Sequence, residues 1–383
     1  MNRKNYLVRY PGIKYILWMI DSFLSLRKPL FRGVILPPKR ILLSNLAHLG
    51  DIVNATAVLP VLKQAFPGVK IGFVVGSSSK DLIENHPMID HIHVVDHWKF
   101  NRSNISFFAK IKQYYRSKNM ALKEIQKQRY DVAMDLYFYL GNAIPLLKKA
   151  NIPVRIGFTS GGFGPLLTHP VDWKFEKGQV IEYYNELLSL LPISQSNLLA
   201  LRPTLSFKDE VLYHRLRKRF NLEKKYIVFH PGAGAQFKEW PLSNWRKLLE
   251  ECVAKGYAVV ITGQGKREKE IAVKLVQDVP NVITCVSLLT LKEFVVLLQK
   301  ADLLVGVDSA AGHIASAVGT QSLLIYPGIN RINEWAPITG AHVLQKPVLC
   351  APCFKRKGCK SMECVQGVLV EDVLLQIVQR VIK

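Results

Sequence analysis

Short apolar runs alternate with longer amphipathic stretches along the first half of the chain. The apolar runs predict buried strands, which lie at 40–45, 69–75, 91–95, 131–135 and 154–158. Apolar residues with helical spacing predict helices, which lie at 52–66, 140–149 and 181–191. Strands that alternate with helices in this way are typical of a parallel sheet with crossover helices.

The second half of the chain repeats the alternation. Its predicted strands lie at 226–230, 258–262, 282–285, 303–306 and 323–326. Its predicted helices lie at 244–255, 268–276, 291–300 and 310–318. We therefore predict an α/β fold of the GT-B type, in which two Rossmann-like domains face a central cleft. The predicted domains are 39–205 and 206–383, and they follow an N-terminal extension at 1–38.

Composition changes this picture mainly through charge. Hydrophobic residues make up 49% of the 383 residues and charged residues 21%, which is a globular composition. The formal net charge is +23, and the pI is near 9.7. Such a surplus indicates an anionic partner: a nucleic acid, acidic lipid headgroups or a phosphorylated acceptor. The sequence shows no helix-turn-helix pattern, RNP aromatic motif or zinc-finger spacing of the two-Cys, two-His kind, so we expect no nucleic-acid partner.

Two segments concentrate the positive charge. Residues 1–40 carry nine Lys or Arg and one acid, Asp21, among aromatic and aliphatic residues. Such a segment either lies on an anionic membrane surface or packs as an extension helix on the first domain. Residues 99–129 carry nine Lys or Arg and one acid, Glu124. A solvated helical face is the usual explanation for such a run, and contacts with acceptor phosphates are the alternative.

The sequence also bears on location. No stretch has the uninterrupted apolar length of a spanning helix, and no small-residue cleavage site follows the apolar residues 15–26. We therefore expect a cytoplasmic protein.

Polar and small residues follow the predicted strand at 303–306, where parallel sheets bind ligands. The loop and the first helical turn after this strand contain Asp308, Ser309, Ala311, Gly312 and His313. Free N–H groups at a helix start suit a phosphate or diphosphate. The alternative is an ordinary helix cap made by the Asp or the Ser of this loop.

Two glycine-containing loops follow other predicted strands. Gly232, Ala233 and Gly234 lack the third glycine of a dinucleotide fingerprint, and 263–266 is not a Walker A sequence. Together they place two loops at strand ends where a nucleotide can approach the backbone. Lys238 follows the first loop closely enough to return its ammonium to a phosphate, although a solvated lysine is the usual case.

The loop after the first predicted strand contains Gly50 and Asp51. The aspartate then lies at or near the start of the following helix. Helix capping is the commoner role for such a residue, and a general base beside the cleft is the functional alternative.

Four stretches, in this order, resemble the motifs of glycosyltransferase family 9, which includes the ADP-heptose:lipopolysaccharide heptosyltransferases. They are ILLSNLAHLGDIVNATAVLPVLKQAFP (41–67), YDVAMDLYFYLGNAIPLLKKANIPVRIGF (130–158), FHPGAGAQFKEWPLSNW (229–245) and GVDSAAGHIASAVGT (306–320). The resemblance covers nearly everything from Arg40 to the C-terminus. The combination is specific, although no single motif is.

The resemblance implies an inverting transferase with an N-terminal acceptor domain and a C-terminal nucleotide-sugar domain. It implies that Asp51 deprotonates the acceptor hydroxyl and that Lys238 neutralises donor phosphate. The groups that would hold the diphosphate and the donor sugar are Asp308, Ser309, His313 and the N–H groups near Ala311 and Gly312. Because a lysine and a helix start would stabilise the leaving group, the chemistry itself needs no metal cofactor.

The chain departs from the family pattern at the donor loops. Family members carry hydroxyl residues where this chain has Gly232, Ala233 and Gly234, so backbone groups would replace side-chain contacts with phosphate. The family's ribose-binding glutamate has its nearest counterpart in Glu268. ADP-heptose is therefore the first guess for the donor rather than an assignment.

Four of the six cysteines are clustered at 350–364, and they are Cys350, Cys353, Cys359 and Cys364. Their spacing favours a structural metal site, with Zn²⁺ as the first candidate and iron as the second. The alternatives are reduced thiols without metal and, in third place, disulfides. Cys252 and Cys285 have the pattern of buried small hydrophobic residues.

Together these features predict a glycosyltransferase that is peripheral at the cytoplasmic face of the inner membrane. It would move a sugar, with heptose as the first guess, from a nucleotide-diphosphate donor to an anionic, lipid-linked or phosphorylated acceptor of the lipopolysaccharide type. Two alternatives are a transferase of the same fold that modifies a protein hydroxyl, and a non-catalytic nucleotide-sugar-binding scaffold. The combined presence of Asp51, Lys238 and His313 argues against the scaffold.

Overall fold

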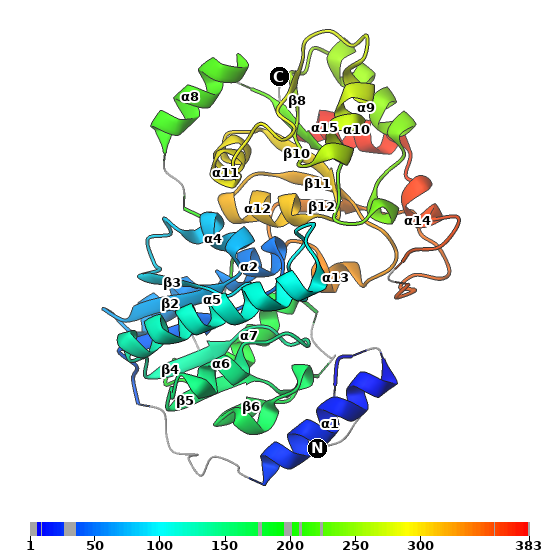
Figure 1. Cartoon of the computed structure of the whole chain (residues 1–383). Coiled ribbons are helices and arrows are strands. Elements are labelled where there is room, and N and C mark those ends of the chain that lie inside the picture. Colours follow the sequence, from blue (N-terminus) through cyan, green and yellow to red (C-terminus); the bar gives the residue numbers. More distant parts are fainter. Residues whose placement is uncertain are drawn as a thin grey trace. The chain divides into compact units, whose positions relative to one another are not determined.

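The computed structural model describes residues 6–8, 10–26, 36–174, 178–194, 201–206, 209–222, 225–355 and 357–381. The chain divides into two compact units, unit 1 at Met1–Pro203 and unit 2 at Thr204–Lys383. Each unit is built around a parallel sheet of its own (Figure 1).

Unit 1 contains, among its described residues, a six-stranded parallel sheet in the order β3-β2-β1-β4-β5-β6. Its strands are β1 (Arg40–Ser44), β2 (Lys70–Val75), β3 (His91–Val94), β4 (Val132–Asp135), β5 (Val154–Phe158) and β6 (His169–Val171). Its helices are α1 (Pro11–Ser25), α2 (Leu49–Ala55), α3 (Val58–Ala65), α4 (Ser77–Ile83), α5 (Phe107–Gln128), α6 (Ile144–Lys149) and α7 (Tyr183–Leu188). Short 3₁₀ turns lie at η2 (Thr159–Gly161), η3 (Gly164–Leu166) and η4 (Val180–Glu182).

The central strands of unit 1 are apolar on both faces because helices cover both sides. Ile41, Leu42 and Leu43 in β1 are completely buried, although their side chains alternate in direction. The long helix α5 contributes Ala121 and Ile125 to this core, and its remaining residues are half-buried or exposed. Within 99–129, α5 therefore presents a solvated basic face.

Unit 2 contains, in its described part, a second six-stranded parallel sheet in the order β12-β11-β10-β7-β8-β9. Its strands are β7 (Ile227–His230), β8 (Val259–Ile261), β9 (Val282–Thr284), β10 (Leu303–Val307), β11 (Ser322–Ile325) and β12 (Ala341–Leu344). Its helices are α8 (Glu210–Phe220), α9 (Leu242–Ala254), α10 (Lys266–Val276), α11 (Leu291–Gln299), α12 (Ala310–Val318), α13 (Ile332–Trp335), α14 (Glu363–Gln366) and α15 (Val370–Arg380), with a 3₁₀ turn at η6 (Gln236–Lys238).

Alternate strand residues of unit 2 point toward the layer formed by α9, α10 and α15. Ile227 and Phe229 of β7 pack with Trp245 of α9, Leu275 of α10 and Ile377 of α15 in one buried cluster. Side chains of the opposite set, such as that of Val228, are equally buried. This explains why these strands are continuous apolar runs in the sequence.

The two sheets have the same topology. In each unit the first strand lies between the second and the fourth, so the strand order reverses beside β1 in unit 1 and beside β7 in unit 2. Such a reversal is a topological switch point, and open α/β sheets bind ligands beyond the carboxyl ends of the strands at that point. The predicted fold of two Rossmann-like halves is confirmed, and the topology directs attention to the ends of β1, β4, β7 and β10.

The helix predicted at 52–66 is wrong in one respect, because the structure divides it into α2 and α3. Pro60 has no N–H and cannot donate to the carbonyl of Thr56, so the first helix ends there. The second helix then begins with the proline inside its first turn, where an N–H is not needed.

Other elements were not predicted from the sequence. β6 contains Pro170, which is tolerated because this strand lies at the edge of its sheet. β12 lies at the edge of the second sheet, and none of its residues is fully buried. Both strands are short and half-buried, so their apolar pattern is weak. Within the described ranges, no helix is long and apolar enough to cross a membrane.

Candidate functional site

The switch point of unit 2 lies between β7 and β10. His230 at the end of β7 pairs in register with Gly306 near the end of β10. The loop after β7 leads to Lys238, and the loop after β10 contains Asp308 and Ser309. These two loops therefore leave the sheet at neighbouring strand ends.

The two loops meet in an ion pair. The Lys238 ammonium lies 2.6 Å from a carboxylate oxygen of Asp308, and 24% and 16% of the two side chains are exposed. His313, in the first turn of α12, lies near both, because the charges of Asp308 and Lys238 both act on its imidazole. Burial lowers the pKa of His313 to about 4, so the ring is neutral at pH 7. The structure thus brings together Lys238, Asp308 and His313, and it leaves the cation partly open to a ligand.

The start of α12 is only partly explained by capping. Ser309 is the N-cap residue, but its side chain makes no capping bond, and its hydroxyl is buried without a hydrogen-bond partner. Ala311 and Gly312 are buried. A Cβ on Gly312 would lie 2.7 Å from a methyl carbon of Leu324, so close packing of α12 on β11 requires this glycine. Gly312 therefore has a packing role in addition to any contact with a ligand.

The second predicted donor feature is the glycine loop with Glu268. A Cβ on Gly232 would lie 2.1 Å from the Glu268 carboxyl carbon, and a Cβ on Gly263 would lie 2.5 Å from a carboxylate oxygen. The Gln264 N–H donates to Glu268 at 2.8 Å. Burial raises the pKa of Glu268. The two glycines thus make room for one carboxylate between neighbouring strand ends.

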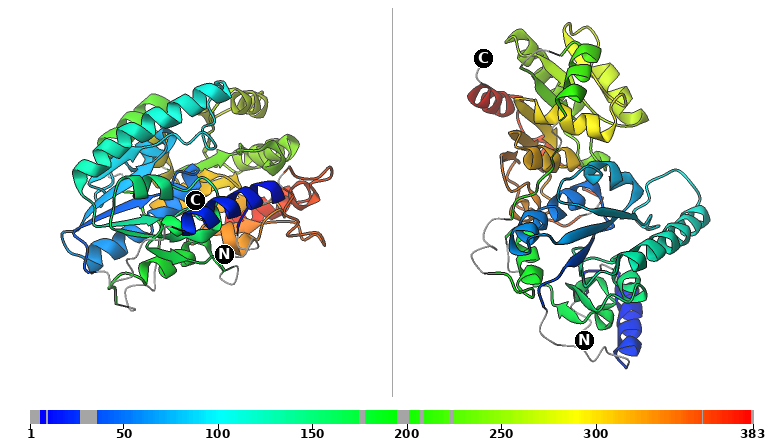
Figure 2. Two further views of the ribbon diagram at one scale, coloured as in Figure 1. Left: turned by 60° about the horizontal axis from the view of Figure 1, so that its bottom comes forward. Right: turned by 90° about the vertical axis from the view of Figure 1, so that its left-hand side faces the viewer.

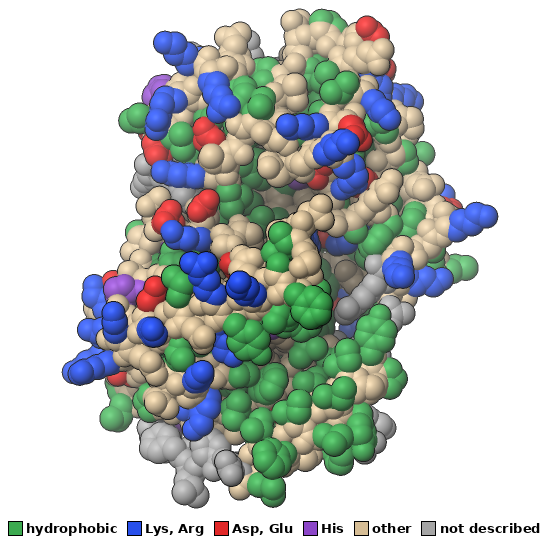
Figure 3. All heavy atoms as spheres, in the orientation of Figure 1, with side chains coloured by type: hydrophobic (Ala, Val, Ile, Leu, Met, Phe, Trp, Pro, Cys, Tyr) green, Lys and Arg blue, Asp and Glu red, His purple; other side chains and the backbone are tan. Residues whose placement is uncertain are grey.

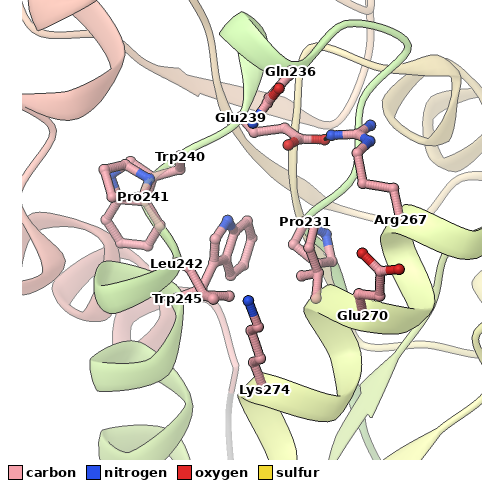
Figure 4. Close-up of a pocket in the computed structure, with 11 residues that line it drawn as sticks. Pro231, Gln236, Glu239, Trp240, Pro241, Leu242, Trp245, Arg267, Glu270 and Lys274 are labelled. Carbon is pink, nitrogen blue, oxygen red and sulfur yellow. Dashed lines mark hydrogen bonds and ion pairs between the residues drawn. The ribbon is translucent and has the colours of Figure 1, made fainter.

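A side-chain pair that the sequence analysis missed holds this loop in place. Glu239 accepts a hydrogen bond from the Ala233 N–H at 3.1 Å, and its carboxylate also pairs with the Arg267 guanidinium. Arg267 in turn donates to the Ala233 carbonyl at 2.8 Å. Figure 4 shows the pair at the rim of a cavity of about 360 Å³ beside Trp240 and Trp245. Gly234 lies at the exposed tip of the same loop.

The switch point of unit 1 contains Asp51. This residue is the third of α2, and one of its carboxylate oxygens accepts a hydrogen bond from the His48 N–H at 3.1 Å. Asp51 therefore does cap the start of α2, as one of the two interpretations predicted. Burial nevertheless raises the pKa of Asp51 to about 6, while the His48 N–H and the charge of Arg102 act in the opposite direction. A capping carboxylate with such a pKa is able to exchange protons near neutral pH.

A second carboxylate, Asp135, ends β4 beside β1 and was missed from the sequence. It is completely buried and accepts hydrogen bonds from the N–H groups of Tyr137 at 3.0 Å and Ala143 at 2.6 Å. Burial raises its pKa to about 7. The charges of Asp51 and Asp135 both help burial to raise the pKa of Tyr184, so this phenol lies near both carboxylates. The strand-end position of Asp135 was the available clue.

The four clustered cysteines lie around one small cavity of about 60 Å³. Cys364 is buried, Cys353 and Cys359 are half-buried, and Cys350 is exposed. Among the described residues, however, no three His, Cys, Asp or Glu side chains are arranged to hold a metal ion. The geometry therefore does not fit the predicted metal site. Cys252 and Cys285 are buried as predicted, and burial raises the pKa of each thiol to about 12.

Known proteins are similar to this chain in sequence and in fold. The sequence model of glycosyltransferase family 9 (heptosyltransferase) matches residues 120–364. Lipopolysaccharide heptosyltransferase 3 of Escherichia coli is 26% identical over 299 residues, which are 75% of this chain and 83% of that protein.

Two solved structures show the fold. The family 9 glycosyl transferase of Veillonella parvula matches with a TM-score of 0.72 and 19% identity, over 89% of this chain and 96% of that one. ADP-heptose lps heptosyltransferase II of E. coli matches with a TM-score of 0.68 and 19% identity, over 88% and 99%. These likenesses confirm the predicted GT-B type of α/β fold.

Proposed function

Because the chain belongs to glycosyltransferase family 9, the heptosyltransferase family, and is thus a glycosyltransferase, we propose that it transfers a sugar with inversion from a nucleotide-diphosphate donor to an anionic acceptor of the lipopolysaccharide type. Unit 2 binds the donor, and unit 1 supplies the base. The observation that carries the proposal is a contrast between the units. In unit 1 the Asp51 carboxylate can exchange a proton near neutral pH, and in unit 2 Lys238 and Asp308 form an ion pair.

The chemical step is a single displacement. The acceptor hydroxyl gives its proton to the Asp51 carboxylate while its oxygen forms a bond to the anomeric carbon. The bond between that carbon and the diphosphate oxygen breaks, and the nucleoside diphosphate leaves with the electron pair. One displacement without a covalent enzyme intermediate inverts the anomeric centre. A pKa of about 6 keeps Asp51 mostly ionised at pH 7 and basic enough to accept a proton.

The leaving diphosphate needs positive charge and hydrogen-bond donors. Lys238 supplies the charge, and the first turn of α12 supplies N–H groups in a helix of nine residues. His313, being neutral, serves as a hydrogen-bonding group rather than as a cation. These groups are sufficient to stabilise the leaving group, so the step as proposed does not require a metal ion.

ADP-heptose is the first candidate for the donor. One of the matching structures is, by its name, an ADP-heptose heptosyltransferase. The position of Glu268 between Gly232 and Gly263 supports a role for its carboxylate in accepting hydrogen bonds from a ribose. The loop at 232–234 has no hydroxyl side chains, so its contacts with phosphate come from the backbone.

An anionic acceptor is supported by the basic loop that contacts the helix of Asp51. The rings of His48 and Phe100 meet edge to face with centroids 5.5 Å apart. Arg102, further along the same loop, is close enough for its charge to lower the pKa of Asp51. A phosphate or carboxylate of the acceptor would find a cation here beside the base. A lipid-linked acceptor of this kind would place the enzyme at the cytoplasmic face of the inner membrane.

The first test measures binding and transfer separately. Thermal shift with ADP, UDP and GDP and with their sugars identifies the donor, because a ligand that binds the folded state raises the unfolding midpoint. Labelled donor is then offered with heptose-free lipopolysaccharide, with the same acceptor after phosphatase treatment, and with a serine-rich peptide. We expect a shift with ADP and ADP-heptose, and transfer that phosphatase treatment weakens.

Each other outcome has a defined meaning. A shift only with UDP- or GDP-sugars would show that the donor is not ADP-heptose. Transfer to the peptide would show that the acceptor is a protein hydroxyl rather than a lipopolysaccharide. Binding without transfer to any acceptor would favour the non-catalytic scaffold. Lys255→Met, which changes an exposed lysine at the C-terminal end of α9 that does not line the cavity beside Trp240, is the matched control for the donor-site variants.

A further inference from the structure

The outward face of α1 is apolar. Its exposed positions are dominated by large hydrophobic side chains, with exposed fractions of 47% for Tyr15, 56% for Ile16, 52% for Met19 and 65% for Phe23. Tyr10 and Leu26, next to the two ends of the helix, are 68% and 81% exposed. Single exposed apolar residues are ordinary, but a contiguous row of this kind marks an interaction surface.

The inward face of α1 fixes this orientation. Leu17 is buried against Gly162, where an added Cβ would lie 2.8 Å from a leucine methyl. Asp21 is 1% exposed and accepts hydrogen bonds from the Tyr6 hydroxyl at 2.9 Å and from the Phe163 N–H at 2.8 Å. The one acidic residue of the extension therefore points inward, and the apolar row points away from unit 1.

A second apolar cluster lies at the start of α5. Trp98, Ile105, Phe107 and Phe108 are exposed by 37%, 43%, 58% and 82%. The rings of Trp98 and Phe107 lie 5.7 Å apart, and those of Phe107 and Phe108 lie 6.2 Å apart. We call this cluster the aromatic corner. Both α1 and α5 lie on the side of unit 1 that faces the viewer in Figure 1, and the turned views of Figure 2 agree.

Positive charge lies on the same side of unit 1 as the apolar surface. Figure 3 shows apolar side chains gathered over α1 and Lys and Arg side chains over α5 on the same side. Exposed cations of α5 include Lys112, Arg116 and Lys123. In the sequence, the residues on either side of α1 add Arg3, Lys4, Arg9, Arg27, Lys28 and Arg32.

We propose that the outward face of α1 and the aromatic corner form a docking surface for an anionic lipid bilayer, on which α1 lies flat. This inference rests on the proposed function in that the acceptor is lipid-linked. Aromatic and aliphatic side chains enter the headgroup region, and flanking Lys and Arg bind acidic headgroups. The charge selects the bilayer over a second copy of the chain, because two copies would bring like-charged flanks together.

The test compares vesicle binding by the full chain and by two matched triple variants. Ile16→Ser, Met19→Ser and Phe23→Ser remove the apolar row of α1. Val211→Ser, Val273→Ser and Leu375→Ser remove side chains of unit 2 that are similarly exposed, by 68%, 67% and 54%. Vesicles consist of equal parts phosphatidylglycerol and phosphatidylethanolamine, or of phosphatidylcholine alone, and binding is measured by flotation.

We expect the unchanged chain to float with the anionic vesicles and not with phosphatidylcholine. The α1 variant should lose roughly tenfold or more of its partition coefficient, and the unit 2 variant should keep it. Phe107→Ser with Phe108→Ser should weaken binding as well. Lys112→Gln, Arg116→Gln and Lys123→Gln together should reduce the dependence of binding on salt.

Three results would overturn the proposal: equal flotation of the two triple variants, equal binding to both kinds of vesicle, or a dimer in light scattering that only the α1 substitutions dissociate. The last result would make the face an interface between copies. An unchanged circular dichroism spectrum and unfolding midpoint of the α1 variant without ligand show that the variant is folded. Thermal shift with the nucleotide sugar, measured on the same variant, separates failure of this inference from failure of the proposed function, because the proposed donor groups lie in unit 2.

Discussion

The two switch points have the same strand topology and opposite electrostatics. In unit 1 two carboxylates, Asp51 in the helix after β1 and Asp135 at the end of β4, lie near Tyr184, and burial raises the pKa of both. In unit 2 the loops after β7 and β10 pair a carboxylate with a cation, Asp308 with Lys238 at 2.6 Å. The same position in the fold thus holds an exchangeable proton in one unit and a charge pair in the other.

The difference teaches that the side chains, and not the sheet, decide what a switch point does. A buried carboxylate without a paired cation shifts toward the protonated form, which suits a base that works near pH 7. A carboxylate paired with an ammonium holds that ammonium in position for a phosphate. The predictions that follow test this contrast.

The largest expected effect comes from Asp51→Asn. Loss of a general base slows transfer by roughly 10²- to 10⁴-fold. Donor affinity, measured by titration calorimetry, should not change, because the proposed donor groups lie in unit 2. Full transfer activity in a folded Asp51→Asn protein would show that Asp51 is not the general base.

Lys238→Met should act on the other switch point. Charge-assisted hydrogen bonds contribute about 1.5–3 kcal/mol, so donor affinity should fall roughly 10- to 150-fold. The pKa of Asp51 should stay unchanged in the pH profile of the remaining activity. Unchanged affinity in this variant, alongside the Lys255→Met control, would contradict the phosphate role.

The pH profile of transfer sharpens the assignment of the base. Asp51 must be ionised to accept a proton, and its pKa is raised to about 6. The rate at low substrate should therefore fall as pH drops below about 6, by roughly tenfold for each further pH unit. An acid limb near pH 4 would show that burial does not act on Asp51 in the working enzyme.

Gly232→Ala should have a smaller effect. The added Cβ would displace the Glu268 carboxylate, which is the mobile end of its side chain. The loss of about one hydrogen bond to the ribose would weaken donor binding roughly fivefold. Gly76→Ala is a suitable control, because its Cβ would meet its nearest neighbour, the Ser78 hydroxyl, at 3.9 Å.

Asp135→Asn should change stability rather than donor binding. The folded state binds a proton at Asp135 with a pKa of about 7, whereas an unfolded aspartate has a pKa of about 4. The free energy of unfolding should therefore fall as pH rises from about 4 to about 7, and the substitution should remove this part of the slope. Urea unfolding at several pH values, with the exposed Asp81→Asn as control, measures it.

The sequence predicted the parts of the site that lie in local motifs. Asp51, Asp308 and His313 follow strands that the apolar pattern revealed, so their place at strand ends could be predicted. The contact between Lys238 and Asp308 joins positions 70 residues apart, and only the order of the strands brings them together. The glycine loop was also predicted, but the Glu239–Arg267 pair that holds it depends on how α10 approaches the loop.

Other features could not be predicted because burial decides them. Asp135 resembles any strand-end aspartate in the sequence, and its raised pKa comes from complete desolvation between β1 and β5.

The cysteine spacing indicated a metal site, whereas the described residues do not bring three such ligands together. For the N-terminal extension, the sequence left membrane contact and packing as alternatives. The structure shows α1 packed on unit 1 through Leu17 and Asp21.

The buried carboxylate of Asp21 holds α1 in one rotation about its own axis. A helix that is apolar almost all the way round has little reason to prefer one rotation about its own axis to another. If α1 rolled by half a turn, it would bring the carboxylate into contact with solvent and would leave the Phe163 N–H without the acceptor it has at 2.8 Å. The choice between rotations therefore depends on the two hydrogen bonds that Asp21 accepts, together with the packing of Leu17, and Asp21→Leu would remove both hydrogen bonds.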